Sequence, residues 1–402
     1  MAPTLSNELL LKAVEKFDTP LYVYDEERIH FQYSKLLHAF HQSDVKIFYA
    51  CKALSNINIL RILQKLGSGI DCVSLNEVQF ALKAGFEPSK IIFTPNSVSI
   101  DDYKEAVSIG VNINIDNLEI LRQFGEHYGS SYPVVVRINP HIMAGGNIKI
   151  STGHIDSKFG ISIDQIDQIL KIKSQTQIKI KGLHLHTGSE IKEVDVFING
   201  LQLMLELSKK FEELSIIDLG GGFKVPYKPD EKGANIDELG MRLHETLSKF
   251  ETDQHKKFQI WFEPGKYIVS EAGYFLTKAT IIKENPTRTF VGVDSGFNHL
   301  IRPMFYDAYH IIHNISNTKG PVKQYNVVGN ICETDTFAWD RALHEVSPGD
   351  ILLFNNAGAY GFEMSSRFNS RTRPAEVLVN KGEMKLIRRR ETLDDLIQGQ
   401  VL

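Results

Sequence analysis

The feature that most constrains the fold is a regular alternation of short β-rich runs with longer amphipathic stretches over the first two-thirds of the chain. The β-rich runs are VKIFYA ending at Ala50, IDCV at Val73, KIIFT at Thr94, VNINID at Asp116, PVVVRIN at Asn139, IKIKGLHLH at His186, SIIDLG at Gly220 and KFQIWFE at Glu263. Mostly apolar strands that alternate with helices indicate a parallel sheet buried on both faces. About eight such units in roughly 250 residues are typical of a (β/α)8, TIM-like barrel, and an open doubly wound sheet is the alternative.

The sequence changes in character after Ala272. Runs such as YFLTKATII, RTFVGVD, QYNVVG, DILLFNN and AEVLVN are β-rich, with few helical patterns between them, and they indicate a separate all-β domain. The segment Leu21–Asp25 precedes the first barrel unit, and we expect it to pair with this domain. The chain is therefore predicted to be an α/β protein with a barrel over residues 26–272 and a β-domain built from residues 1–25 and 273–402.

The composition and charge of the chain limit which binding partners and which cellular compartment are expected. The 402 residues include 45 Lys and Arg against 49 Asp and Glu, a net charge of -4 that gives no support to a nucleic-acid partner. No apolar run approaches the roughly 20 residues of a membrane helix, and Lys12, Glu15 and Lys16 break the N-terminal apolar patch, so neither a membrane span nor a secretory signal is expected. Three cysteines are too few for a disulfide framework, which favours a reducing cytoplasm.

Polar residues gather where the predicted barrel strands end. They are Lys52, Asp71, Arg137, Asn139, His184, His186, the tri-glycine Gly220–Gly222 and Glu263. In a (β/α)8 barrel these ends meet at one rim, where the active site lies. The sequence therefore predicts a site at this rim, and it predicts no metal site there.

The residue types at this rim fit pyridoxal 5'-phosphate. Lys52, partly desolvated at the barrel mouth, could form a Schiff base with an aldehyde. The glycines of DLGGGF let the backbone approach an anion closely, after a strand whose loop often holds phosphate in this fold. A carboxylate such as Glu263 keeps a pyridine nitrogen protonated and makes the ring an electron sink. A histidine could stack on the ring, and Ser189 could donate to the phosphate.

Nine segments resemble the diaminopimelate decarboxylases, in matching order and spacing over nearly the whole chain. They are FYACKALSN, IDCVSLNEV, STGHIDSKFGI, GLHLHTGSEI, DLGGGFKVPY, FEPGKYIVSEAG, VGNICETDTF, AGAYGFEMSSRFNSRTRPAEVLV and RRRETLDDL. The resemblance implies an alanine-racemase-type barrel with a β-domain, pyridoxal 5'-phosphate as cofactor, and conversion of meso-diaminopimelate to L-lysine and carbon dioxide through an external aldimine. This reaction is the last step of lysine biosynthesis.

The resemblance also implies which residues hold the cofactor. Lys52 would form the Schiff base, His186 would stack on the ring, and Glu263 would pair with the pyridine nitrogen. The other cofactor contacts would come from Ser189, Gly220, Gly221, Gly222, Pro264, Gly265, Lys266 and Tyr360.

Catalysis would also need the second domain. The resemblance implies that Cys332 protonates the carbanion and that Glu333 contacts the distal amine of the substrate. Arg302, Tyr306 and Tyr360 would bind the substrate as well. In this family the segment around Cys332 reaches the partner's site, so an obligate homodimer with shared active sites is implied.

Lys266 departs from the family, which usually has arginine at the fourth position of the EPG turn, where it binds a substrate carboxylate. Arginine grips a carboxylate in a two-pronged fork, whereas lysine offers a point charge. Because the charge is kept, the same role is predicted for Lys266.

Three other functions stay open. Decarboxylation of another basic amino acid such as ornithine is disfavoured by the ICETD, IRPMFY and GAYGF segments. Glu263 speaks against a racemase, which places arginine at the pyridine nitrogen. A non-enzymatic cofactor-binding protein would not need Cys332. Outside the site, Arg371 and Arg373 are interpreted as structural, and the terminal KLIRRRE run as a solvated face.

Overall fold

The computed structural model describes residues 5–142, 153 and 157–401, so residues 151, 152 and 154–156 of STGHIDSKFGI lie outside the described residues. The chain forms two compact units. The barrel unit comprises Tyr33–Val225 and Lys232–Tyr267. The mixed-sheet unit comprises the N-terminal segment through Gln32, Pro226–Glu231 and the segment from Ile268 onward.

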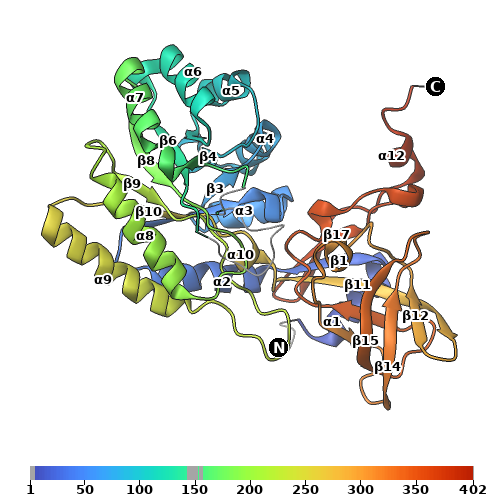
Figure 1. Cartoon of the computed structure of the whole chain (residues 1–402). Coiled ribbons are helices and arrows are strands. Elements are labelled where there is room, and N and C mark those ends of the chain that lie inside the picture. The colour runs from blue at the N-terminus through green and yellow to red at the C-terminus, as the bar shows by residue number, and fades with distance from the viewer. Residues whose placement is uncertain (1–4, 143–152, 154–156, 402) are drawn as a thin grey trace. The chain divides into compact units, whose positions relative to one another are not determined.

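Eight parallel strands close the barrel unit (Figure 1). They are β2 (Val45–Ala50), β3 (Gly69–Cys72), β4 (Ile91–Phe93), β5 (Asn112–Ile115), β6 (Val134–Asn139), β8 (Ile180–His184), β9 (Ile216–Asp218) and β10 (Gln259–Phe262). They pair in this order, and β10 pairs with β2 to close the ring, while the short β7 (Ile161–Ser162) pairs with β6. The predicted (β/α)8 barrel is confirmed, and the open doubly wound sheet is wrong because β10 and β2 are hydrogen-bonded neighbours.

Helices lie between successive barrel strands. They are α3 (Ile57–Lys65), α4 (Leu75–Ala84), α5 (Ile100–Ile109), α6 (Leu118–Tyr128), α7 (Ile166–Thr176), α8 (Val194–Ser208) and α9 (Ile236–Gln254), while α2 (Glu26–Ala39) precedes β2. Local sequence sets their limits: Ser74 accepts the Glu77 N–H at the start of α4, and Gly85 ends that helix with φ of 99°. Such short connections hold each strand end at a fixed place on the rim.

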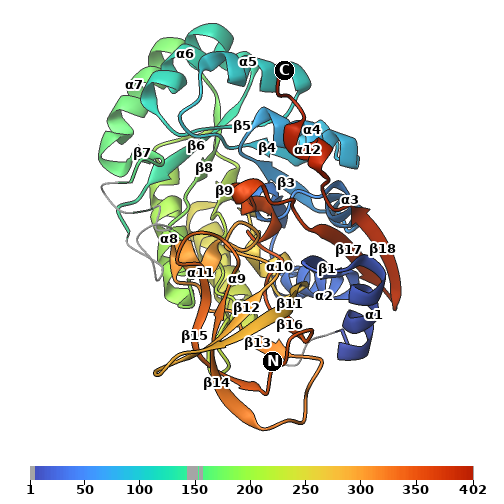
Figure 2. The same cartoon turned by 90° about the vertical axis from the view of Figure 1, so that its right-hand side faces the viewer.

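The second unit is built on a mixed sheet. Its strands are β1 (Leu21–Asp25), β11 (Gly273–Glu284), β12 (Thr289–Val293), β13 (Ile312–Asn314), β14 (Val322–Val328), β15 (Thr336–His344), β16 (Ile351–Phe354), β17 (Ala375–Asn380) and β18 (Glu383–Arg388). The main path is β15-β14-β12-β11-β1-β17-β18, and β16 joins β11 to β13. Strand β1 is antiparallel to β11 and parallel to β17 (Figure 2).

Helices and an apolar core complete this unit. The helices are α1 (Asn7–Phe17), α10 (Lys266–Val269), which begins in the barrel unit, α11 (Arg302–Tyr306) and α12 (Leu393–Ile397). Val23 of β1 is fully buried with Leu276, Leu353 and Val377 of three other strands, and α1 adds Leu10 to the same cluster. Burial of alternate strand residues explains why the N-terminal segment joins strands from the far end of the chain.

The terminal arginine run is not simply a solvated face. Arg388 pairs with Glu376, whose side chain is fully buried, and Arg390 donates to the backbone oxygen of Pro20 at 2.8 Å. Lys385 and Arg389 are exposed, as predicted, but the prediction is wrong for Arg388 and Arg390. Arg390 lies at the end of α1, where bare carbonyl oxygens need donors.

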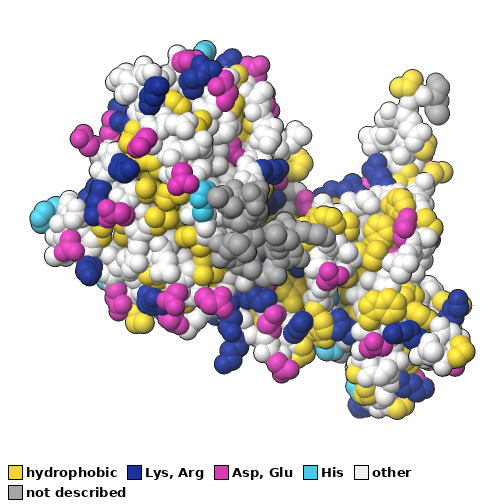
Figure 3. Space-filling view, viewed as in Figure 1, with side chains coloured by type: hydrophobic (Ala, Val, Ile, Leu, Met, Phe, Trp, Pro, Cys, Tyr) yellow, Lys and Arg dark blue, Asp and Glu magenta, His cyan; other side chains and the backbone are white. Residues whose placement is uncertain are grey.

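The charged surface agrees with the balanced composition. On the visible face of the barrel unit, Lys and Arg side chains are interspersed with Asp and Glu (Figure 3). Among the helices that the structure describes, none has the length and hydropathy needed to cross a membrane.

Candidate active site

Five adjacent barrel strands bring four of the predicted rim residues, together with Asp218, to one edge. The strands are neighbours in the order β8, β9, β10, β2, β3. His184 ends β8, Asp218 ends β9, Glu263 follows β10, Lys52 follows β2 and Asp71 lies on β3. The prediction that these positions share one edge follows from parallel strand order, and the geometry agrees with it.

Lys52 is held by a buried carboxylate. Its Nζ donates to Asp71 Oδ2 at 3.1 Å; the Asp71 side chain is fully buried, whereas 44% of the Lys52 side chain is exposed. Lys52 lies in a short 3-10 turn, Cys51–Ala53. The amine is thus anchored from inside the barrel while part of the side chain stays accessible, as a nucleophile needs.

The EPG turn packs directly against the Lys52 turn. The Ala50 N–H donates to Pro264 O at 3.2 Å. A Cβ added to Gly265 would lie 2.9 Å from Ala53 Cβ and 3.1 Å from Ala50 Cβ, so a larger residue would push the two turns apart. The absence of a side chain at position 265 therefore brings the segment carrying Glu263 next to the one carrying Lys52.

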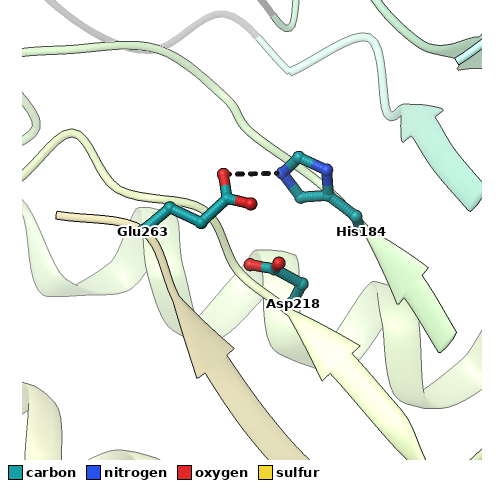
Figure 4. A group of neighbouring side chains, drawn as sticks. All are labelled: His184, Asp218 and Glu263. Carbon is teal, nitrogen blue, oxygen red and sulfur yellow. Dashed lines mark ion pairs between the residues drawn. The ribbon is translucent and has the colours of Figure 1, made fainter. Parts of the chain in front are cut away.

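Three buried ionisable side chains point toward one another from neighbouring strand ends (Figure 4). His184 Nε2 lies 3.5 Å from Glu263 Oε2, and Asp218 completes a group whose ligand atoms all lie within 4.8 Å of one another. Asn114 Nδ2 donates to His184 Nδ1 at 2.6 Å, which leaves the hydrogen of a neutral imidazole on Nε2, facing Glu263.

Burial shifts the titration of all three groups. Burial, followed by the charge of Asp218, raises the pKa of Glu263 well above its ordinary value. Burial also raises the pKa of Asp218 to about 7, against the opposing hydrogen bond from the Gly220 N–H. Burial and the nearby Arg137 lower the pKa of His184 well below its ordinary value, so its ring is neutral. The two carboxyl groups are close enough that the negative charge of Asp218 disfavours ionisation of Glu263.

The tri-glycine turn follows β9 and closes on the loop after β8. The Gly220 N–H donates to Asp218 Oδ1 at 2.9 Å, and the Gly221 N–H donates to His186 Nδ1 at 3.2 Å. Gly222 has φ of 94°, and a Cβ there would lie 2.1 Å from Gly188 O. Ser189, partly exposed, lies in that facing loop. Only glycine fits at position 222, because the turn packs directly against the backbone of the loop after β8.

Lys266 belongs to a cluster of three charged side chains. Its Nζ pairs with Glu190 Oε1, and Lys224 Nζ lies 2.8 Å from Glu190 Oε2. Burial opposes ionisation of Glu190, but the two ammonium groups outweigh it and lower the pKa of this carboxyl. The cluster carries a net charge of about +1, from two lysines and one glutamate. Glu190 thus binds Lys266, whose predicted partner was a carboxylate of the substrate. The cluster of Lys266, Lys224 and Glu190 nevertheless remains positively charged.

The rim fits pyridoxal 5'-phosphate on its own geometry. Glu263 Oε1 is buried and has no hydrogen-bond partner within the described part of the chain, as expected of an acceptor that awaits a protonated ring nitrogen. Lys52 offers the amine on the same rim as the glycine turn. The spacing of His184, Asp218 and Glu263 would also suit a divalent cation, but a cation would not account for Lys52 or the glycines.

Five predicted residues lie in the mixed-sheet unit. Arg302 is buried, with its guanidinium carbon 4.9 Å from the centre of the Tyr227 ring, and its Nε has no partner among residues the structure describes. Tyr306 ends the same helix, α11, and is partly exposed. Tyr360 has φ of 56°, a left-handed conformation that is rare for tyrosine and is found at functional sites.

Cys332 and Glu333 are exposed on the connection between β14 and β15. The Cys332 N–H donates to Asn369 Oδ1 at 3.0 Å, and Asn369 Nδ2 donates to Cys332 Sγ at 3.2 Å. In contrast, Cys51 and Cys72 are fully buried in the barrel unit. The predicted acid is therefore the accessible thiol of the chain.

The barrel and the residues on its rim are typical of one class of enzyme, and similarity to known families identifies that class. The family described as "Pyridoxal-dependent decarboxylase, pyridoxal binding domain" matches residues 26–270. The chain belongs to this family of pyridoxal-dependent decarboxylases, which confirms the predicted enzyme class.

Several similar proteins are named diaminopimelate decarboxylase. That of Methanothermobacter thermautotrophicus is 39% identical, over 97% of this chain and 93% of the relative. The crystal structure of diaminopimelate decarboxylase from Helicobacter pylori complexed with L-lysine has a TM-score of 0.89 and 32% identity, covering 97% of this chain and 98% of that one. A lysine/ornithine decarboxylase from Vibrio vulnificus, at 24% identity and a TM-score of 0.83, shares the fold. The predicted resemblance is confirmed.

Several side chains that shape these sites were not predicted from the sequence. Asn114, Asp218 and Glu190 contact predicted residues, and Lys224 contacts Glu190, but none of the four was assigned a role. Asp218 and Asn114 lie at strand ends, a signal that could have found them. Glu190 and Lys224 lie in loops, and their pairing shows no sequence period.

Proposed function

We propose that this protein decarboxylates meso-diaminopimelate to L-lysine and carbon dioxide, with pyridoxal 5'-phosphate held at the barrel rim. The observation that carries the cofactor assignment is the buried Glu263 carboxylate, whose Oε1 is unpaired among the described residues, on the same rim as the accessible Lys52 amine. The substrate assignment is supported by relatives of 33–39% identity that are named diaminopimelate decarboxylase.

When bound, the cofactor supplies an aldehyde that reacts with amines and a ring that accepts the electron pair of the bond to the departing carbon dioxide. Lys52 would hold the cofactor through its amine. Glu263 would keep the ring nitrogen protonated, His186 would contact the ring, and Ser189 with the glycine turn would bind the phosphate. Pro264 and Gly265 line the same pocket.

Substrate recognition depends on charge. Lys266 with its neighbours, and Arg302, provide positive charge for carboxylates, and Glu333 provides negative charge for the distal amine. Tyr306 and Tyr360 complete the substrate pocket. Cys332 donates a proton to the substrate carbon after carbon dioxide has left. In this proposal the protein is a cytoplasmic homodimer of lysine biosynthesis, in which the partner subunit's Cys332 completes each barrel site.

The decisive experiment offers purified protein and cofactor three substrates separately: meso-diaminopimelate, ornithine and lysine. We expect carbon dioxide release from diaminopimelate, with L-lysine formed in equal amount. Release from ornithine alone would establish the alternative function and overturn this one.

A further inference from the structure

The side chain of Asn369 grips the backbone and the sulfur of Cys332 at the same time. It accepts from the Cys332 N–H through Oδ1 at 3.0 Å and donates to Sγ through Nδ2 at 3.2 Å. A backbone N–H can only donate, so it fixes the amide with Oδ1 toward the backbone and Nδ2 toward the sulfur. The orientation of the amide is therefore set by chemistry.

The segment that carries Asn369 is itself anchored beside Cys332. Arg371 Nη2 donates to Asn330 O at 2.9 Å, and the Ile331 N–H donates to Asp335 Oδ2 at 3.2 Å. The ring of Phe368 stacks on Phe297 at 5.6 Å between centroids. These contacts bracket Cys332 on both sides, so the distance from Asn369 to the sulfur is held by more than one bond.

The backbone at Asn369 is in an uncommon conformation. Its φ is 57° and that of Ser370 is 54°, both in the left-handed region that asparagine tolerates better than most residues. The turn aims the amide at the thiol instead of running as regular structure. Left-handed backbone conformations of residues other than glycine are often found at functional sites.

We propose that Asn369 is a positioning residue that controls the reactivity of Cys332 in the proposed reaction. A donor aimed at sulfur stabilises the negative charge that remains once the thiol has given up its proton, which makes proton donation easier. The second bond holds the backbone of Cys332, so the thiol points in one direction. This inference rests on the proposed function, because it gives the thiol the task of proton donor.

The test separates the two contacts with matched variants. Asn369→Asp keeps an acceptor for the Cys332 N–H but replaces the donor at sulfur with a carboxylate, and Asn369→Ala removes both contacts. Ser370→Ala changes the exposed neighbour in the same turn and is the control. Iodoacetamide, a neutral probe, labels the holoenzyme at fixed pH, and peptide mass spectrometry reports alkylation of Cys332 separately from the buried Cys51 and Cys72.

We expect Asn369→Asp to slow alkylation of Cys332 about fivefold or more, because a carboxylate disfavours a neighbouring thiolate. Asn369→Ala should fall between that variant and the wild type, and Ser370→Ala should match the wild type. In turnover of diaminopimelate, Asn369→Asp should lower kcat about tenfold with KM and cofactor absorbance unchanged.

The outcomes distinguish this inference from the function on which it rests. Wild-type alkylation rates in both Asn369 variants would overturn it, and so would slowed alkylation with unchanged kcat. If the wild type released no carbon dioxide from diaminopimelate, the proposed function would fail together with the catalytic half of this inference. The alkylation rates would still decide whether Asn369 controls the thiol.

Discussion

The barrel rim and the Cys332 loop hold functional groups in opposite ways. In the barrel, Asp218 and Glu263 are buried at or beside the ends of parallel strands, and burial is the largest cause of their raised pKa values. In the mixed-sheet unit, Cys332 is exposed on a loop; its N–H donates to Asn369, and its sulfur accepts from Asn369. Rigid strand ends suit a cofactor that stays in place, whereas an exposed loop suits a group that must meet a substrate or a second chain.

The largest effect should come from the barrel amine. Lys52→Ala should lower turnover by roughly three orders of magnitude or more, since the covalent anchor of the cofactor is lost. Borohydride reduction of the holoenzyme should label Lys52 in the wild type and leave the variant unlabelled. The control is Lys46→Ala, an exposed lysine on the same strand, β2. If borohydride labelled a residue other than Lys52 in the wild type, the assignment of Lys52 would be wrong.

The matching change in the other unit should separate binding from chemistry. Cys332→Ala should lower kcat about a hundredfold while cofactor binding and absorbance stay unchanged, because the thiol acts only on protonation. Carbon dioxide release and an absorbance titration measure the two quantities. Thr334→Ala, an exposed change two residues away, should behave as the wild type. Turnover that survives in Cys332→Ala would remove the thiol from the mechanism.

The barrel carboxyls should make stability depend on pH. Burial raises the pKa of Asp218 to about 7, above the unfolded value of about 3.9, so its contribution is present below pH 4 and lost as pH rises toward 7. In cofactor-free protein, the free energy of unfolding of the wild type should fall relative to that of Asp218→Asn as pH rises through that window. The difference should change by about 1 kcal/mol per pH unit. Urea unfolding at pH 5 and pH 7 measures this difference, and an equal offset at both values would show that Asp218 does not titrate there.

The smallest effect should come from the cluster of Glu190, Lys224 and Lys266. Glu190→Gln should lower the free energy of unfolding by about 2 kcal/mol at pH 7, because Lys224 and Lys266 lose their shared counter-charge. The pKa of Glu190 is lowered, so this difference should shrink as pH falls below the unfolded value of about 4.3. Denaturant titration measures it, with the exposed Glu193→Gln as control. A difference independent of pH would argue against the ion pairs.

Local pattern predicted the barrel and much of its rim. Apolar runs marked all eight strands, and parallel order brought Lys52, Glu263 and the glycine turn to one edge. The same reasoning failed for the terminal arginines, because Arg390 contacts Pro20, 370 positions away in the sequence.

The sequence by itself determined which strands form and which residue types end them, because side-chain periodicity and turn chemistry act over a few residues. Only the tertiary structure decided that Glu190 binds Lys266 and that Asn369 holds Cys332. Those partners are 76 and 37 residues apart, and in each pair one partner lies in a loop. Loops carry no hydrophobic period, so their pairing is set by the packed elements that support them.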